Sequence, residues 1–91
     1  MQDYLNELKQ YLRVFHSSDD DNLQFLLNSS IRELKDLVDS DMTDERFREL
    51  VYNRVRYAYN GDLEFFNENF QNAILDLSFH SLKEDADEED I

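Results

Sequence analysis

The 91-residue sequence contains no cysteine, no proline and no tryptophan, and it has a single glycine. Without cysteine the chain can form no disulfide, no thiolate metal site and no thiol nucleophile. An all-β domain needs a tight turn about every 8–12 residues, and such turns draw on glycine and proline. The scarcity of both residues therefore argues against a β-sandwich or a β-barrel.

Basic residues are scarce as well. Nine lysines and arginines stand against 22 aspartates and glutamates, so the formal net charge is −13. Six of the acids fall within residues 84–91, which leaves 16 acids, nine bases and a charge of −7 for residues 1–83. A surface this negative repels nucleic-acid phosphates and anionic lipids, so we expect neither specific DNA binding nor membrane binding.

Long apolar runs are absent too. A transmembrane helix needs about 20 consecutive apolar residues, and no stretch approaches that length. The N-terminus, Met1-Gln2-Asp3-Tyr4, has neither the basic start nor the apolar block of a signal peptide. We therefore expect the protein to be cytosolic when it is made.

Apolar residues recur at helical spacing through most of the chain. The spacing predicts four helices, over residues 3–15, 20–38, 44–59 and 63–82. Thr43 and Asp62 are the expected N-caps of the third and fourth helices, and Gly61 ends the third. The predicted fold is all-α: a compact bundle of about four helices over residues 1–83, with a disordered acidic C-terminal tail over residues 84–91.

Each predicted helix carries one stripe of side chains that would face the core. In chain order the four stripes comprise Tyr4, Leu8, Tyr11, Leu12 and Phe15; Leu23, Leu27, Ser30, Ile31, Leu34, Leu37 and Val38; Phe47, Leu50, Val51, Val55 and Ala58; and Leu63, Phe66, Phe70, Ala73, Ile74 and Leu77. The core they predict is small for a free-standing domain.

No arrangement of residues indicates catalysis. The two histidines, His16 and His80, have no partner at the spacing of a metal site. The stretch that begins at Asp39 resembles a calcium loop, but it has Asp44 where that loop needs glycine and Leu50 where it needs glutamate. A phosphate-binding glycine loop cannot be built from one glycine. We expect a protein that is not an enzyme and that takes no cofactor and no metal.

Three departures from simple patterning indicate an interface. On the second predicted helix, Phe25 and Arg32 fall on the outer face, where Phe25 is either an ordinary exposed side chain or a contact residue. On the third, Arg54 falls inside the apolar stripe. Its guanidinium either reaches solvent or a carboxylate of its own chain, or it reaches an acid on a neighbouring subunit.

The fourth predicted helix gives the strongest indication. Leu75, Phe79 and Leu82 form a second apolar stripe about 150° from the first. A helix with two apolar stripes is buried on both sides, either by its own domain or by another chain. In a chain this short, another protein chain is the favoured cover.

Two stretches of the sequence follow the motif order of a known family. The first comprises Tyr11-Leu12-Arg13-Val14, the acidic cap Ser18-Asp19-Asp20-Asp21-Asn22-Leu23, and then Leu26, Leu27 and Ile31. The second runs over residues 47–60 and continues with Leu63-Glu64-Phe65-Phe66, Asn69 and Phe70. Over residues 4–82 the chain thus resembles the head–tail connector family of tailed phages, small all-helical adaptors also described as DNA-packaging or head-completion proteins. The loop at residues 39–42 departs from the family, many of whose members have a glycine-containing turn there.

The resemblance implies a structural role. Such a protein would form a ring, dodecameric in the virion, beneath the portal protein. It would extend the DNA channel and dock the next neck or tail-completion protein. DNA would pass through without being bound specifically, which the negative charge favours. The protein would lie in the virion neck, and in the host cytoplasm during assembly. Its subunit or portal contacts would be Phe25, Arg32, Arg54, Leu75, Phe79 and Leu82.

Two other classes of protein stay open. An acidic DNA mimic would occupy the DNA groove of a nucleic-acid enzyme, with carboxylates spaced like phosphates along one face. A small regulatory or antitoxin-like module would bind a protein partner without forming a ring. Light scattering with and without portal protein separates the connector from the mimic, because a mimic needs neither self-assembly nor a portal.

Overall fold

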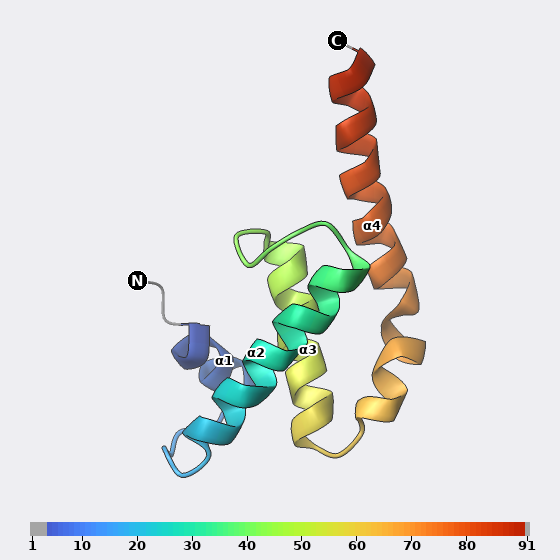
Figure 1. Cartoon of the computed structure of the whole chain (residues 1–91). Helices are drawn as coiled ribbons and strands as arrows, with labels where there is room; N and C mark the ends of the chain where they lie inside the picture. Colours follow the sequence, from blue (N-terminus) through green and yellow to red (C-terminus); the bar gives the residue numbers. More distant parts are fainter. Residues whose placement is uncertain (1–3, 91) are drawn as a thin grey trace.

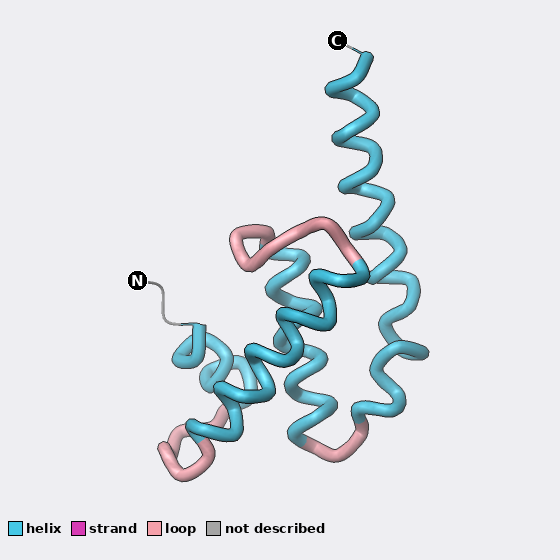
Figure 2. Tube along the Cα trace, viewed as in Figure 1, coloured by secondary structure: helices cyan, strands magenta, loops and turns pink. Residues whose placement is uncertain are grey.

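The computed structural model of this chain describes the backbone of residues 4–90 and the side chains of residues 4–79. Every regular element in this part of the chain is helical (Figures 1 and 2). In chain order the elements are α1 (Tyr4–Leu12), α2 (Asp20–Leu37), α3 (Glu45–Tyr59), the short 3-10 helix η1 (Leu63–Phe65) and α4 (Phe66–Asp90). The predicted all-α fold with four main helices is confirmed.

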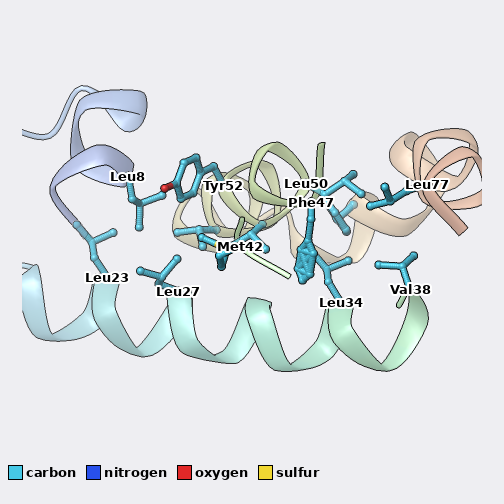
Figure 3. Close-up of a cluster of buried hydrophobic side chains, with 13 residues drawn as sticks. Leu8, Leu23, Leu27, Leu34, Val38, Met42, Phe47, Leu50, Tyr52 and Leu77 are labelled. Atoms are coloured by element: carbon cyan, nitrogen blue, oxygen red, sulfur yellow. The ribbon is translucent and has the colours of Figure 1, made fainter. Parts of the chain in front are cut away.

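The core forms where α2 packs against α3. Figure 3 shows a row of α2 side chains, Leu23, Leu27 and Leu34, pointing toward the other helices. Leu8 of α1 covers one end of this row, and Leu77 of α4 lies at the other. The buried apolar residues are Leu8, Leu23, Leu27, Leu34, Val38, Met42, Phe47, Leu50, Val51, Tyr52, Val55, Phe66 and Leu77.

α1 ends three residues before the predicted position. Arg13 takes a left-handed backbone conformation (φ 61°), and its N–H donates to the carbonyl oxygen of Gln10 at 3.2 Å. The N–H of Val14 donates to the carbonyl oxygen of Lys9 at 2.9 Å. This pair of hydrogen bonds is a Schellman ending, which satisfies the last carbonyls of a helix. Phe15 therefore leaves the helical stripe and is 83% exposed, so its prediction as a core residue was wrong.

α3 begins one residue later than predicted. Asp44 is the N-cap, and its carboxylate accepts a hydrogen bond from the Arg46 N–H at 2.8 Å. Thr43, the predicted cap, instead donates its own N–H to the carboxylate of Asp41 at 2.9 Å. This turn brings Met42 back to the core, where it is buried. Because Thr43 is engaged with the Asp41 carboxylate, the N-cap of α3 lies at Asp44 instead of Thr43.

The end of α3 lies where the sequence predicts it. Gly61 has φ 81°, a left-handed conformation that glycine adopts without steric cost. Its N–H donates to the carbonyl oxygen of Ala58 at 3.2 Å, and the next N–H, of Asp62, donates to that of Tyr57 at 2.7 Å. The only glycine in the sequence is therefore used as a Schellman stop.

α4 starts later than predicted, because the chain first makes a single 3-10 turn, η1. Asp62 precedes this turn but makes no side-chain capping bond. Three aromatic side chains then pack α4 against α3. Phe66 stacks on Phe70 with ring centroids 5.0 Å apart, and Tyr57 meets Phe70 edge-to-face at 5.5 Å. Such aromatic pairs add stability beyond the apolar area that they bury.

The backbone of α4 continues past the predicted end near residue 82, as far as Asp90. Glutamate, alanine and lysine are good helix formers, and the main-chain bonds of a helix need no partner element. The last turns of α4 extend away from α1, α2 and α3 (Figure 1). This arrangement fits an acidic tail that takes no part in the packed body.

Several other residues predicted to face the core lie at the surface. Leu37, at the end of α2, is 55% exposed. The pattern of α2 places it at the margin of the inward face. The remaining exposed members of the predicted stripes are Tyr11, Leu63 and Ala73.

Candidate protein-binding surface

Among its described residues, α4 carries two exposed apolar side chains that do not face the core. Phe79 is 67% exposed and Leu75 is 47% exposed. The third member of this predicted stripe, Leu82, lies outside the residues whose side chains are described. Leu37 lies beside α4, because its carbonyl oxygen accepts a hydrogen bond from Ser78 Oγ at 3.5 Å. Leu37 was predicted to be buried, and the sequence pattern gave no sign that it adds to the exposed apolar surface near α4.

The two predicted contact residues of α2 are exposed on that helix. Phe25 is 66% exposed, and Arg32 is exposed as well. At helical spacing both fall on the face of α2 opposite the buried residues Leu23 and Leu27. α3 lies on the core side, and α4 packs on α3. The structure therefore does not gather the predicted contact residues of α2 and α4 into one patch.

Arg54 is tied to its own chain. Its guanidinium Nη1 donates a hydrogen bond to Ser30 Oγ at 3.0 Å, and Ser30 is fully buried in α2. Burial lowers the pKa of Arg54, and the negative charge of Glu33 opposes that change. The hydrogen-bond partner is thus a hydroxyl of its own chain, whereas the sequence had left open solvent, a carboxylate of its own chain and an acid on a neighbouring subunit. Ser30 was placed on the core face correctly, and Arg54 supplies the bond that a buried hydroxyl requires.

Polar contacts join α1 to α3 at the other end of the body. Tyr52 Oη donates to the Glu7 carboxylate at 2.9 Å, and Arg48 Nε lies 3.3 Å from the same carboxylate. Arg48 also donates to the carbonyl oxygen of Met42 at 3.2 Å. Burial, together with the bond to Glu7, raises the pKa of Tyr52 well above its usual range. These groups satisfy one another and hold α1 in place, which is a structural use of their charges.

A groove of about 600 Å³ separates α3 from α4. Leu50 and Leu77 form its buried floor, and Ala73 lies between the rings of Phe70 and Phe79 along its α4 wall. Because the alanine side chain ends at Cβ, it leaves space opposite α3 that a larger residue would fill. The lining residues are Arg46, Glu49, Leu50, Asn53, Phe70, Ala73, Asp76, Leu77 and Phe79.

No pattern in the sequence predicts this groove. The one sequence feature related to the groove is Ala73, a small residue inside an apolar stripe. The helical pattern predicted that this alanine lies in the core. Phe79 was identified, and it now has a second setting: it lies on the outer face of α4 and also at the edge of the groove.

Among residues with described side chains, no group of three or more histidines, cysteines, aspartates or glutamates is placed to hold a metal ion. Within the same part of the chain, no helix combines the length and the apolar character needed to cross a bilayer.

Comparison with known proteins gives no match. No protein-family model, no curated protein and no solved structure matches this chain. What the protein does must therefore be inferred from its own sequence and surface.

Proposed function

We propose that this protein is an assembly component of the phage head–tail connector type. It docks on the portal protein, surrounds the DNA channel as a ring of copies and presents a surface to the next neck or tail-completion protein. The observation that carries the proposal is the apolar outer face of α4, where Leu75 and Phe79 stand exposed. The motif order of residues 4–82 supports it.

The exposed face has the character of a contact surface. Burying a side chain the size of Phe79 against a partner contributes about 1.5–3 kcal/mol, and Leu75 adds a comparable amount. In a closed ring each such contact recurs at every subunit boundary. A modest gain per copy therefore becomes a large gain for the assembled ring.

The net charge of −13 shapes how such a ring would form and work. Copies of the same sign repel one another, so we expect the ring to form on the portal rather than free in solution. A channel lined by negative charge offers no counter-charge to DNA phosphates, which lets the genome slide past. No chemical step is needed for this role.

The experiment that tests the proposal is multi-angle light scattering of the purified protein, alone and with purified portal protein. We expect a monomer alone and a complex of many copies when the portal is present. If the protein forms no complex with the portal protein, the proposal is refuted. If it instead displaces duplex DNA from a restriction enzyme, it is an acidic DNA mimic.

A further inference from the structure

The groove between α3 and α4 has the dimensions of a helix-binding site. The residues of α4 that line it run from Phe70 to Phe79, nine positions or about 13 Å along the helix axis. The apolar anchors of an amphipathic helix, at positions i, i+3 or i+4, and i+7, span about 10 Å and fit within this length. The volume of about 600 Å³ has room for such anchors.

The charge around the groove is unequal. The chain as a whole carries a net charge of −13. Glu49 and Asp76 lie among the residues that line the groove, and Arg46 is the one base among the described lining residues. Two other arginines of α3 are engaged elsewhere: Arg48 with Glu7, and Arg54 with Ser30.

These charges decide which occupant fits. A second copy of this chain would bring another net charge of −13 to a groove whose described lining holds two acids and one base. Like charges held close together in an interface oppose binding, and opposite charges favour it. The groove therefore selects against a second copy and against an acidic helix.

We propose that the groove between α3 and α4 binds a basic amphipathic helix of a different protein. The apolar anchors of that helix contact Leu50, Ala73 and Leu77, and its lysines or arginines lie against Glu49 and Asp76. The inference goes beyond the proposed function, because it names the chemistry of a partner and requires neither a ring nor a portal.

The test uses three synthetic peptides of about 18 residues, long enough to span the groove as a helix. The first has leucines at i, i+4, i+7 and i+11 with lysines on its polar face. The second has glutamates in place of the lysines, and the third has the first peptide's composition with the leucine spacing scrambled. Binding to the full chain is measured by fluorescence anisotropy.

We expect the basic amphipathic peptide to bind at least about tenfold more tightly than either of the other two. Its binding should weaken as the salt concentration rises from about 50 to about 300 mM, because salt screens exposed charges. Equal binding of the glutamate peptide would overturn the charge argument. Equal binding of the scrambled peptide would show that charge alone, and no groove, is responsible.

The variant Ala73→Glu locates the site. It fills the groove while adding a negative charge, so it should weaken the basic peptide about tenfold if the groove is the site. The control, Gln71→Glu, adds the same charge at an exposed position of α4 that does not line the groove. It should leave the affinity unchanged or slightly higher. If Ala73→Glu keeps its helical circular dichroism and binds the basic peptide as tightly as the wild type or more tightly, the groove is not the binding site and the proposal is wrong.

A third variant separates this inference from the proposed function. Leu75→Asp alters the outer face of α4 and does not line the groove. It should lose portal binding while retaining the basic peptide within about twofold. Light scattering of the free protein completes the test. If the wild type is a dimer that Ala73→Glu dissociates, the occupant is a second copy and the proposal is wrong.

Discussion

Replacing Phe79 by aspartate separates the outer face of α4 from the core. The side chain is 67% exposed, so its loss removes little packing within the chain. Exposed substitutions of this kind change the free energy of unfolding by about 0.5 kcal/mol or less. In an interface the same change removes about 1.5–3 kcal/mol of apolar burial per contact. It also places a carboxylate where water is excluded, which costs more again.

The matched control is Leu77→Asp, two positions earlier on the same helix. Leu77 is 2% exposed and lies in the core beside Val38 and Leu50 (Figure 3). Truncating a buried leucine costs about 2–5 kcal/mol, and an unpaired buried carboxylate adds to that cost. A domain with a total stability of about 5–15 kcal/mol would be unfolded or nearly so.

The assay combines thermal melting by circular dichroism, light scattering with the portal protein and rescue of a phage that lacks this gene. We expect Phe79→Asp to keep its helical spectrum and melting temperature, and to lose portal binding and rescue. Leu77→Asp should lose its helical spectrum. If both variants unfold alike, the outer stripe of α4 belongs to the core. If Phe79→Asp binds the portal as the wild type does, this face is no docking surface.

Three further changes test how the body is held together. Arg54→Ala should lower the free energy of unfolding by about 1–3 kcal/mol, because it strands the buried hydroxyl of Ser30. In urea titration, the double variant Ser30→Ala with Arg54→Leu should recover most of the free energy of unfolding that Arg54→Ala loses. Equal stability of the wild type and these variants would place Arg54 at the surface. Deleting residues 84–91 should leave the melting temperature nearly unchanged, whereas a drop of many degrees would show that this segment packs on the body. Tyr52 has a raised pKa, so its contribution is fully present below pH 10 and is lost as the pH rises above its ordinary value of 10.0. Tyr52→Phe should therefore lose less stability than the wild type between about pH 9 and pH 11, and parallel losses would refute this assignment.

Helical spacing was enough to predict the number and order of the helices. Leu23, Leu27 and Leu34 recur on one face of α2, and that face is buried against α3. Gly61 marked the end of α3, because a left-handed residue was needed there and glycine takes that conformation at no steric cost. These signals are local, so they survive without knowledge of the tertiary packing.

The sequence predictions were wrong where non-local or competing contacts determine the local structure. A spacing rule cannot show that Arg13 adopts a left-handed conformation, so Phe15 was carried one turn too far along α1. It cannot show which side chains the neighbouring helices leave uncovered, so Leu37 was placed inside. The groove depends on what stands opposite Ala73, and no property of α4 alone contains that information.

The central position of α3 has a kinetic consequence. α3 packs against α1, α2, η1 and α4, whereas α1 and α2 have only each other until it is present. A chain emerging from the ribosome therefore forms no stable intermediate until α3, which carries the core residue Val55, has emerged. Once α3 is available, α2 and α3 pair across a loop of a few residues, and such local pairing is fast, on the order of microseconds to milliseconds. Folding should thus begin only once α3 has been made and then be abrupt, and fragments cut before α3 should be substrates for proteases.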